Sequence, residues 1–226
     1  MTSDPADILI ALQFGDSAFP AGSFAFSWGL EGLAADGLVA TAADVGDAIA
    51  EQLAQRWHTM DRPLLRAAFA ARTTADLIAL DHLAEAATWA EPMRAGSRRA
   101  GRAMLGVFAR LGHAGVAAYR TAAAGDGRLG HLAVTQGLVF REAGLSLSVA
   151  ESVSGWSLAS SLASAAIRLG VVGHLDAQRI LGEARVLLTD LLARDPVDVH
   201  AISSFTPLAD VAVARSASRH LRMFAT

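Results

Sequence analysis

The sequence has no cysteine, no lysine and no asparagine, and its 19 basic side chains are all arginine. Without cysteine, the chain cannot form a disulfide-stapled secreted fold, a zinc ribbon, an Fe–S site or a cysteine-protease site. Without lysine, it has no P-loop for nucleotide phosphates and no amine for Schiff-base chemistry. If the function needs nucleotide hydrolysis, a partner must therefore supply it.

The sequence also has no hydrophobic run long enough to cross a membrane. The longest uncharged run, Ser152 to Ile167, has 16 residues, six of them serine, whereas a spanning helix needs about 20. The first seven residues contain two aspartates and no basic side chain, so we expect no signal peptide and a cytoplasmic protein. The net charge of −3 gives no general affinity for nucleic acid.

What the sequence has in abundance is alanine, with 49 residues, and apolar residues that recur with helical spacing. Thr41 and Asp44 resemble a capping box that opens a helix. One apolar face follows at spacings of three and four: Val45, Ile49, Leu53, Trp57, Met60 and Leu64. Because Pro63 lacks a backbone donor, we expect a kink or a break between Trp57 and Leu64.

Further helices are expected near 77–87, 92–111, 131–143 and 145–169. Asp176 is expected to cap the next helix, and Thr206 with Pro207 to open a last one, which we expect to be an interface element more than a core element, with Leu208 and Val211 on the face away from its arginines. The stretch 112–130 contains five glycines and is expected to be a loop. The prediction is a single all-α domain over residues 1–226, a compact bundle of about eight to ten helices in two halves on either side of this loop.

The chain shows no local catalytic or metal-binding pattern. No two of its seven histidines lie within 17 residues of each other, and GxSxG is absent. A zinc-type site normally draws on ligands at short spacing, so we predict no catalytic residue, no resident metal and no cofactor.

Two arginine groups could instead bind a partner. Arg94, Arg98 and Arg102 share one helix face, which Ala95 and Gly101 would leave bare for an acidic surface or a phosphate; alternatively, the arginines form a solvated face. A second group, at the end of the last helix, either binds a partner or interacts with the helix dipole: Arg215, Arg219 and Arg222.

The segment from Phe14 to Glu31 combines proline, glycines and aromatic residues. This composition is typical of a tight loop that enters a helix, with Ser23 as a possible N-cap. A packing corner and a binding site are both compatible with it.

In this segment the sequence resembles the UreF family of urease accessory proteins, and the matching residues are Pro20, Gly22, Phe24, Ser27, Gly29, Leu30 and Glu31. The resemblance continues along the chain through Asp61, Pro63, Leu64, Leu65, Ser97, Arg98, Gly101, Gly137, 166–170, Gly173, Asp176, Gln178, Thr206, Pro207, Asp210, Arg222 and Phe224. Two positions depart from the family pattern. Trp28 stands where the family usually has histidine, and Ser216 with Ala217 replaces a His-Glu pair.

The resemblance implies a non-catalytic, dimeric, all-α adaptor that joins the accessory protein UreD, also called UreH, to the GTPase UreG. This assembly delivers nickel to apo-urease and supports carbamylation of its active-site lysine, and the adaptor could modulate the GTPase. We predict that nickel is handled transiently at most, with Glu31, Asp61 and His220 as the first contacts to test. The predicted partner-binding residues are Phe24, Ser27, Glu31, Arg94, Arg98, Arg102, Gln178, Arg219, Arg222 and Phe224.

Two other functions remain open from the sequence. One is an all-α nucleic-acid-binding regulator that uses the basic helix around Arg98, although the net charge is acidic. The other is an α-helical enzyme whose site is assembled from distant positions.

Overall fold

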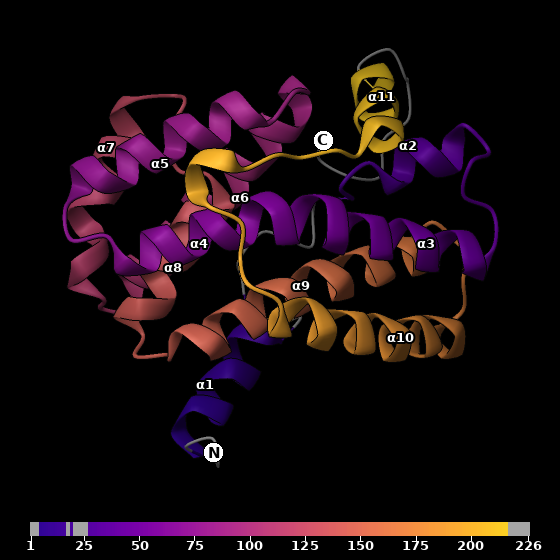
Figure 1. The fold of residues 1–226 in the computed structure, drawn as a ribbon, viewed down its shortest axis with the longest axis horizontal. Coiled ribbons are helices and arrows are strands. Elements are labelled where there is room, and N and C mark those ends of the chain that lie inside the picture. The colour runs from indigo at the N-terminus through magenta and orange to yellow at the C-terminus, as the bar shows by residue number, and fades with distance from the viewer. Residues whose placement is uncertain (1–4, 17–18, 20–26, 217–226) are drawn as a thin grey trace.

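A long helical rod runs across the middle of the molecule (Figure 1). The computed structural model describes residues 5–16, 19 and 27–216, and every element among them is a helix, which confirms the all-α prediction. The rod consists of α3 (Ala42–Gln52), the π-helix η2 (Leu53–Asp61) and α4 (Arg62–Ala70). It begins with the predicted capping box, in which Thr41 and Asp44 bond each other's backbone N–H. Its predicted apolar face is buried.

A π-helix stands where the sequence predicts a kink or a break, and the chain stays helical through it, so the helix does not break there. The N–H of Arg62 bonds the carbonyl of Trp57, five residues earlier. An α-helical bond to the carbonyl of Thr59 cannot form, because Pro63 carries no N–H. The wider π turn accommodates the proline while the helix continues, and π segments are frequent at functional sites.

The helix α8 (Leu132–Glu142) is almost completely buried and packs against both α4 and α6 (Glu91–Arg110). Gly137 allows the close approach, since a Cβ there would lie 2.4 Å from the carbonyl oxygen of Leu65. The helices α5 (Thr74–Ala87) and α7 (Ala117–Gly125) cover the same end of the molecule (Figure 1).

At the other end, α9 (Leu147–Arg168) and α10 (His174–Ala193) pack against each other and against α3. Both helices were expected, but Asp176 is not the N-cap. The N-cap is Gly173, three residues earlier, and Asp176 accepts a hydrogen bond from Arg179 at 2.7 Å. A carboxylate stabilises any position in the first turn through the helix dipole, so the residue type does not identify the cap.

The glycine-containing stretch 112–130 is not a simple loop. It contains the 3-10 helix η3 (Ala114–Val116) and α7. Tyr119 of α7 is buried, and its hydroxyl donates to Asp81 at 2.6 Å, so tertiary contacts stabilise a helix that the flanking glycines obscure. One hydrophobic core joins the two ends of the molecule. Among the described helices, none combines the length and apolar character that a membrane span requires.

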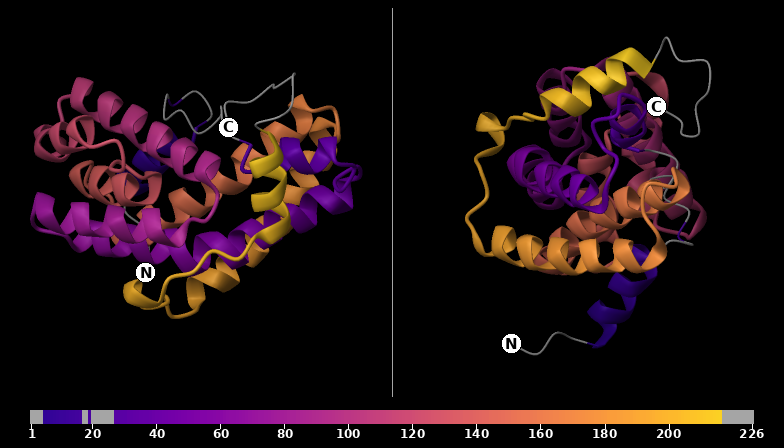
Figure 2. Two further views of the ribbon diagram at one scale, coloured as in Figure 1. Left: turned by 90° about the horizontal axis from the view of Figure 1, so that it is seen from above. Right: turned by 90° about the vertical axis from the view of Figure 1, so that its right-hand side faces the viewer.

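The two ends of the chain occupy different sides of the bundle. The helix α1 (Pro5–Gly15) extends away from the body, whereas α2 (Leu30–Ala35) packs beside α11 (Pro207–Ser216) (Figure 1). A strap, residues 194–206 with the 3-10 helix η4 (Val199–Ala201), connects α10 to α11 across the rod (Figure 2). The start of α11 at Pro207 is as predicted.

The helix α11 turns its larger apolar side chains outward. Leu208 and Val211 are 57% and 40% exposed, while Ala209 and Ala212 are buried. The reason is the close approach to α2, because a Cβ on Gly32 would lie 2.8 Å from the carbonyl oxygen of Ala212. Ala209, Ala212 and Val213 therefore face α2, and Leu208 and Val211 point outward.

Candidate functional site

The π-helix carries a buried ion pair between Arg56 and Asp61. Arg56 is 1% exposed, and its Nε lies 3.4 Å from Oδ2 of Asp61. Neither Nε nor Nη1 has a hydrogen-bond partner among the described residues. Buried polar groups usually have a hydrogen-bond partner, so these two nitrogen atoms of Arg56 are unusual in the interior.

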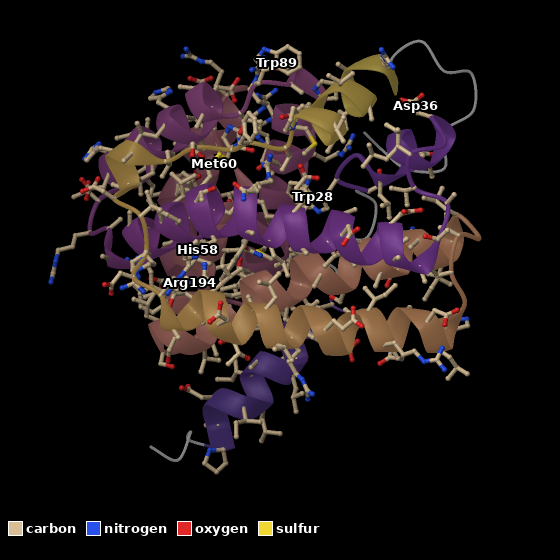
Figure 3. The ribbon with its side chains drawn as sticks, turned by 45° about the vertical axis from the view of Figure 1, so that its right-hand side comes forward. Trp28, Asp36, His58, Met60, Trp89 and Arg194 are labelled. Atoms are coloured by element: carbon tan, nitrogen blue, oxygen red, sulfur yellow. The ribbon has the colours of Figure 1, made fainter. Side chains whose placement is uncertain are left out.

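Trp28 packs against the same guanidinium, whose Cζ lies 4.8 Å from the centroid of the indole ring. Trp28 has a φ of 50°, and Gly29 follows with 89°. A bulky residue in the left-handed region costs about 1–3 kcal/mol, and such conformations cluster at functional sites. In Figure 3 the labelled Trp28 lies beside the rod.

A small cavity of about 30 Å³ lies beside Trp28, Trp57 and Asp61, and is termed here the Asp61 cavity. Trp57 Nε1 donates to the hydroxyl of Ser154 at 3.2 Å, and that hydroxyl donates to Oε1 of Gln136 at 2.8 Å. The remaining wall is Leu132, Ala133, Ser157, Leu158 and Ser161. The cavity is large enough for about one water-sized group and has polar partners for it.

The electrostatics connect this cavity to the last helix. Burial raises the pKa of Asp61, an effect that Arg56 partly offsets. Burial also raises the pKa of Asp210, on α11, and Arg56 again acts in the opposite direction. One buried arginine therefore interacts with carboxylates from both η2 and α11.

A second cavity of about 20 Å³ adjoins the first. The two share the wall residues Leu132, Gln136, Ser157 and Ser161, and the second cavity extends to Phe14, Asp16 and Phe19. The serines come from one face of α9. The interior between α8 and α9 is thus partly polar from Asp61 towards the end of α1.

The predicted arginine face of α6 is occupied by contacts within the chain. Arg98 pairs with Glu85 at 2.6 Å and with Glu91 at 2.7 Å. Arg94 pairs with Glu91, and Arg102 donates to loop carbonyls that include that of Leu129 at 3.0 Å. The face is therefore neither bare nor simply solvated.

Gly101 has a different role from the expected one. It does not leave a surface open, because a Cβ there would lie 2.1 Å from the carbonyl oxygen of Gly130. It permits the close packing of α6 against the loop before α8.

The other predicted partner-binding residues are scattered. Ser27 is fully buried next to Trp28, Glu31 lies in the first turn of α2, and Gln178 is exposed on α10. Ser27 thus adjoins Trp28, which lines the Asp61 cavity. Four predicted residues lie outside the described part of the chain, as does His220: Phe24, Arg219, Arg222 and Phe224.

The outer face of α11 carries exposed apolar side chains. Phe205, Leu208 and Val211 are 68%, 57% and 40% exposed and follow one another at spacings of three; they are termed the α11 stripe. Neither the exposure of Phe205 nor the role of Arg56 was predicted from the sequence. The sequence feature that indicates Arg56 is its place on the apolar helix face, three residues after Leu53 and next to Trp57.

No cluster of three or more histidine, aspartate or glutamate side chains suited to a metal ion occurs within the described ranges.

The family model for UreF matches residues 39–185. Proteins named urease accessory protein UreF from Yersinia pestis (strain Pestoides F) and Yersinia pseudotuberculosis serotype I (strain IP32953) are each 26% identical, over 97% of this chain and 98% of the relative. The corresponding protein of Yersinia enterocolitica serotype O:8 is 25% identical over the same shares.

Proposed function

Because the chain belongs to the UreF family of urease accessory proteins, we propose that it is the adaptor of a UreD/UreF/UreG complex that supports nickel delivery to apo-urease in the cytoplasm. As a member of an accessory family it is not an enzyme. Its lack of lysine leaves nucleotide hydrolysis to the UreG-type partner, which the adaptor could modulate.

The observation that carries this proposal is the α11 stripe. A helix that buries alanines on one face and exposes Leu208 and Val211 on the other, with the exposed Phe205 just before it, has a surface suited to a protein partner. Exposed aromatic and aliphatic side chains are typical anchors of such interfaces. We assign the UreD-type protein to this stripe.

A homodimer is part of the same proposal, with α1 as its contact. Ile8, Leu9 and Leu12 are 47%, 66% and 65% exposed on a helix that extends from the body (Figure 1). An isolated helix of 11 residues is marginal in water, and a second copy of α1 would cover its apolar side chains. The contact would be isologous, as in most dimers.

For nickel, we propose transient contact with Asp61. Its carboxylate borders the Asp61 cavity, and oxygen ligands from a single side chain bind such an ion only weakly. Glu31 and His220 remain the other predicted contacts. The remaining predicted partner-binding residues stay predictions: Phe24, Ser27, Arg94, Arg98, Arg102, Gln178, Arg219, Arg222 and Phe224.

The test is recovery of the UreD-type and UreG-type proteins on the tagged full chain. Leu208→Asp should reduce recovery of the UreD-type protein at least tenfold, because it places a charge in an apolar contact. Leu175→Asp is the matched control, since Leu175 is 74% exposed on α10. Equal recovery on wild type and Leu208→Asp would contradict the assignment.

The nucleic-acid alternative loses its main support, because Arg94, Arg98 and Arg102 are held by contacts within the chain. A DNA shift assay over a salt series tests it directly, since phosphate binding weakens steeply with salt.

A further inference from the structure

The proline of the rod leaves one carbonyl available to the strap. In an α-helix the carbonyl of Thr59 would bond the N–H of residue 63, which is proline. The N–H of Ser203, in the strap, takes this place at 3.2 Å. A proline in the rod therefore creates an acceptor for a segment about 140 residues later in the sequence.

Two further hydrogen bonds join the strap to the π-helix. The hydroxyl of Thr59 donates to the carbonyl of Ser203 at 2.7 Å, so these two residues bond each other twice. The N–H of Phe205 donates to the carbonyl of Gln55 at 3.0 Å. Consecutive turns of η2 thus fix residues 203 and 205 immediately before α11.

The beginning of the strap is held by the same part of the rod. Arg62 is buried, and its Nη1 donates to the carbonyls of Leu191 at 2.8 Å and Arg194 at 3.1 Å. His58 and Arg194 are labelled at this place in Figure 3. The strap is therefore attached at both ends to residues 55–62.

These contacts determine where the α11 stripe lies. Phe205 belongs both to the stripe and to the hydrogen-bonded part of the strap, and Leu208 follows one turn later. Arg56 of η2, next to Gln55, also interacts electrostatically with Asp210 of α11. The position of the stripe therefore depends on which carbonyl groups η2 presents to the strap.

We infer that Pro63 and Thr59 are positioning residues for partner docking: Pro63 leaves the Thr59 carbonyl to Ser203, and this clamp holds the α11 stripe in the orientation that the partner recognises. The inference rests on the proposed function of the stripe. Neither residue needs to touch the partner.

Pro63→Ala in the full chain is the first test. The new N–H can bond the carbonyl of Thr59, so Ser203 loses its acceptor. Hydrogen exchange at the amides of Ser203 and Phe205 should become at least tenfold faster, and the affinity for the UreD-type protein should fall at least tenfold. Helical circular dichroism should be retained, because alanine favours the helix.

Pro92→Ala is the matched control. Pro92 also lies in the first turn of a helix, but the carbonyl four residues before it, that of Thr88, accepts from Arg94 at 2.8 Å and not from the strap. This variant should leave both the exchange rates and the affinity unchanged.

A second pair of variants keeps the proline. Thr59→Val preserves the shape of the side chain but removes the hydroxyl donor, and should accelerate exchange at Ser203 and weaken binding severalfold. Thr59→Ser restores a hydroxyl and should return both values to within twofold of wild type.

The inference is overturned if Pro63→Ala leaves the two amides as protected as in wild type, or if exchange rises while partner affinity stays unchanged. The exchange measurement needs no partner. If Leu208→Asp binds as well as wild type, the proposed role of the stripe fails, while exchange alone still decides whether Pro63 holds the strap.

Discussion

His131 is a residue whose titration the fold alters strongly. It is 2% exposed, and its Nε2 lies 2.8 Å from Oε2 of Glu85, with Ser97 at the other ring nitrogen. Burial lowers its pKa to about 4, and Glu85 offsets only part of this effect. The neutral imidazole is therefore the form that the folded chain prefers.

This shift predicts a stability that depends on pH. Because the pKa of His131 is lower in the folded chain than in the unfolded one, its contribution is complete above about pH 6.5 and is lost as the pH falls towards 4. The loss should be on the order of 2–3 kcal/mol. Urea unfolding from pH 7 to pH 4.5 measures it, and His131→Gln should flatten this part of the profile. An equally steep profile in the variant would contradict the assignment.

The residues of the site were only partly predictable. Asp61 and Ser27 were identified from motif positions, and the structure places both close to Trp28. The importance of Arg56 depends on a tertiary contact with Trp28 and on the π register, neither of which a helical period reveals. The positive φ of Trp28 is likewise set by packing and not by residue type.

Among the elements, the contact between α2 and α11 is set by glycine. A Cβ on Gly32 would lie 2.8 Å from the carbonyl oxygen of Ala212, whereas a Cβ on Gly46 of α3 would meet nothing within 4 Å. Alanine substitutions at these two glycines therefore form a matched pair, one at a crowded position and one in open space.

Gly32→Ala should destabilise the chain by about 1–3 kcal/mol, since backbone atoms of α11 must move. Gly46→Ala should stabilise it by about 0.5–1 kcal/mol, because alanine favours a helix interior. Thermal unfolding followed by circular dichroism checks both. A destabilised Gly46→Ala, or an unchanged Gly32→Ala, would show that the packing differs from this description.

The exposed helix α1 leads to a second prediction, which concerns the proposed dimer contact. Leu9→Glu with Leu12→Glu should convert the proposed homodimer to monomer without loss of fold, because these side chains contribute little to the core. Light scattering after size exclusion gives the mass. A dimer that survives both substitutions would exclude α1 as the main contact.

Element boundaries followed from the sequence where local chemistry determines them. The predicted capping box at Thr41 starts its helix through its own side chain. A second capping box, at Thr73, was not predicted, and its helix begins three residues before the expected start near 77. The expectation of a loop at 112–130 failed because distant residues decide there: Tyr119 supports α7 through Asp81. Contact with α2 likewise determines which face of α11 is buried.

At the scale of the whole molecule, one core supports two separated apolar surfaces, α1 and the α11 stripe. A chain with two such surfaces can contact a second copy and a partner at once, as an adaptor requires. The all-α fold was predictable because the apolar period is helical almost throughout. The outward face of α11 was not, because it depends on two helices meeting.

The most direct test of the adaptor function is the nickel content of urease purified from cells that lack this chain and are complemented with variants. Wild type and Leu175→Asp should give the same nickel content, whereas Leu208→Asp with Val211→Asp should give less than about a tenth of it, while circular dichroism shows the variant folded. Full nickel loading with the folded stripe variant would contradict the account.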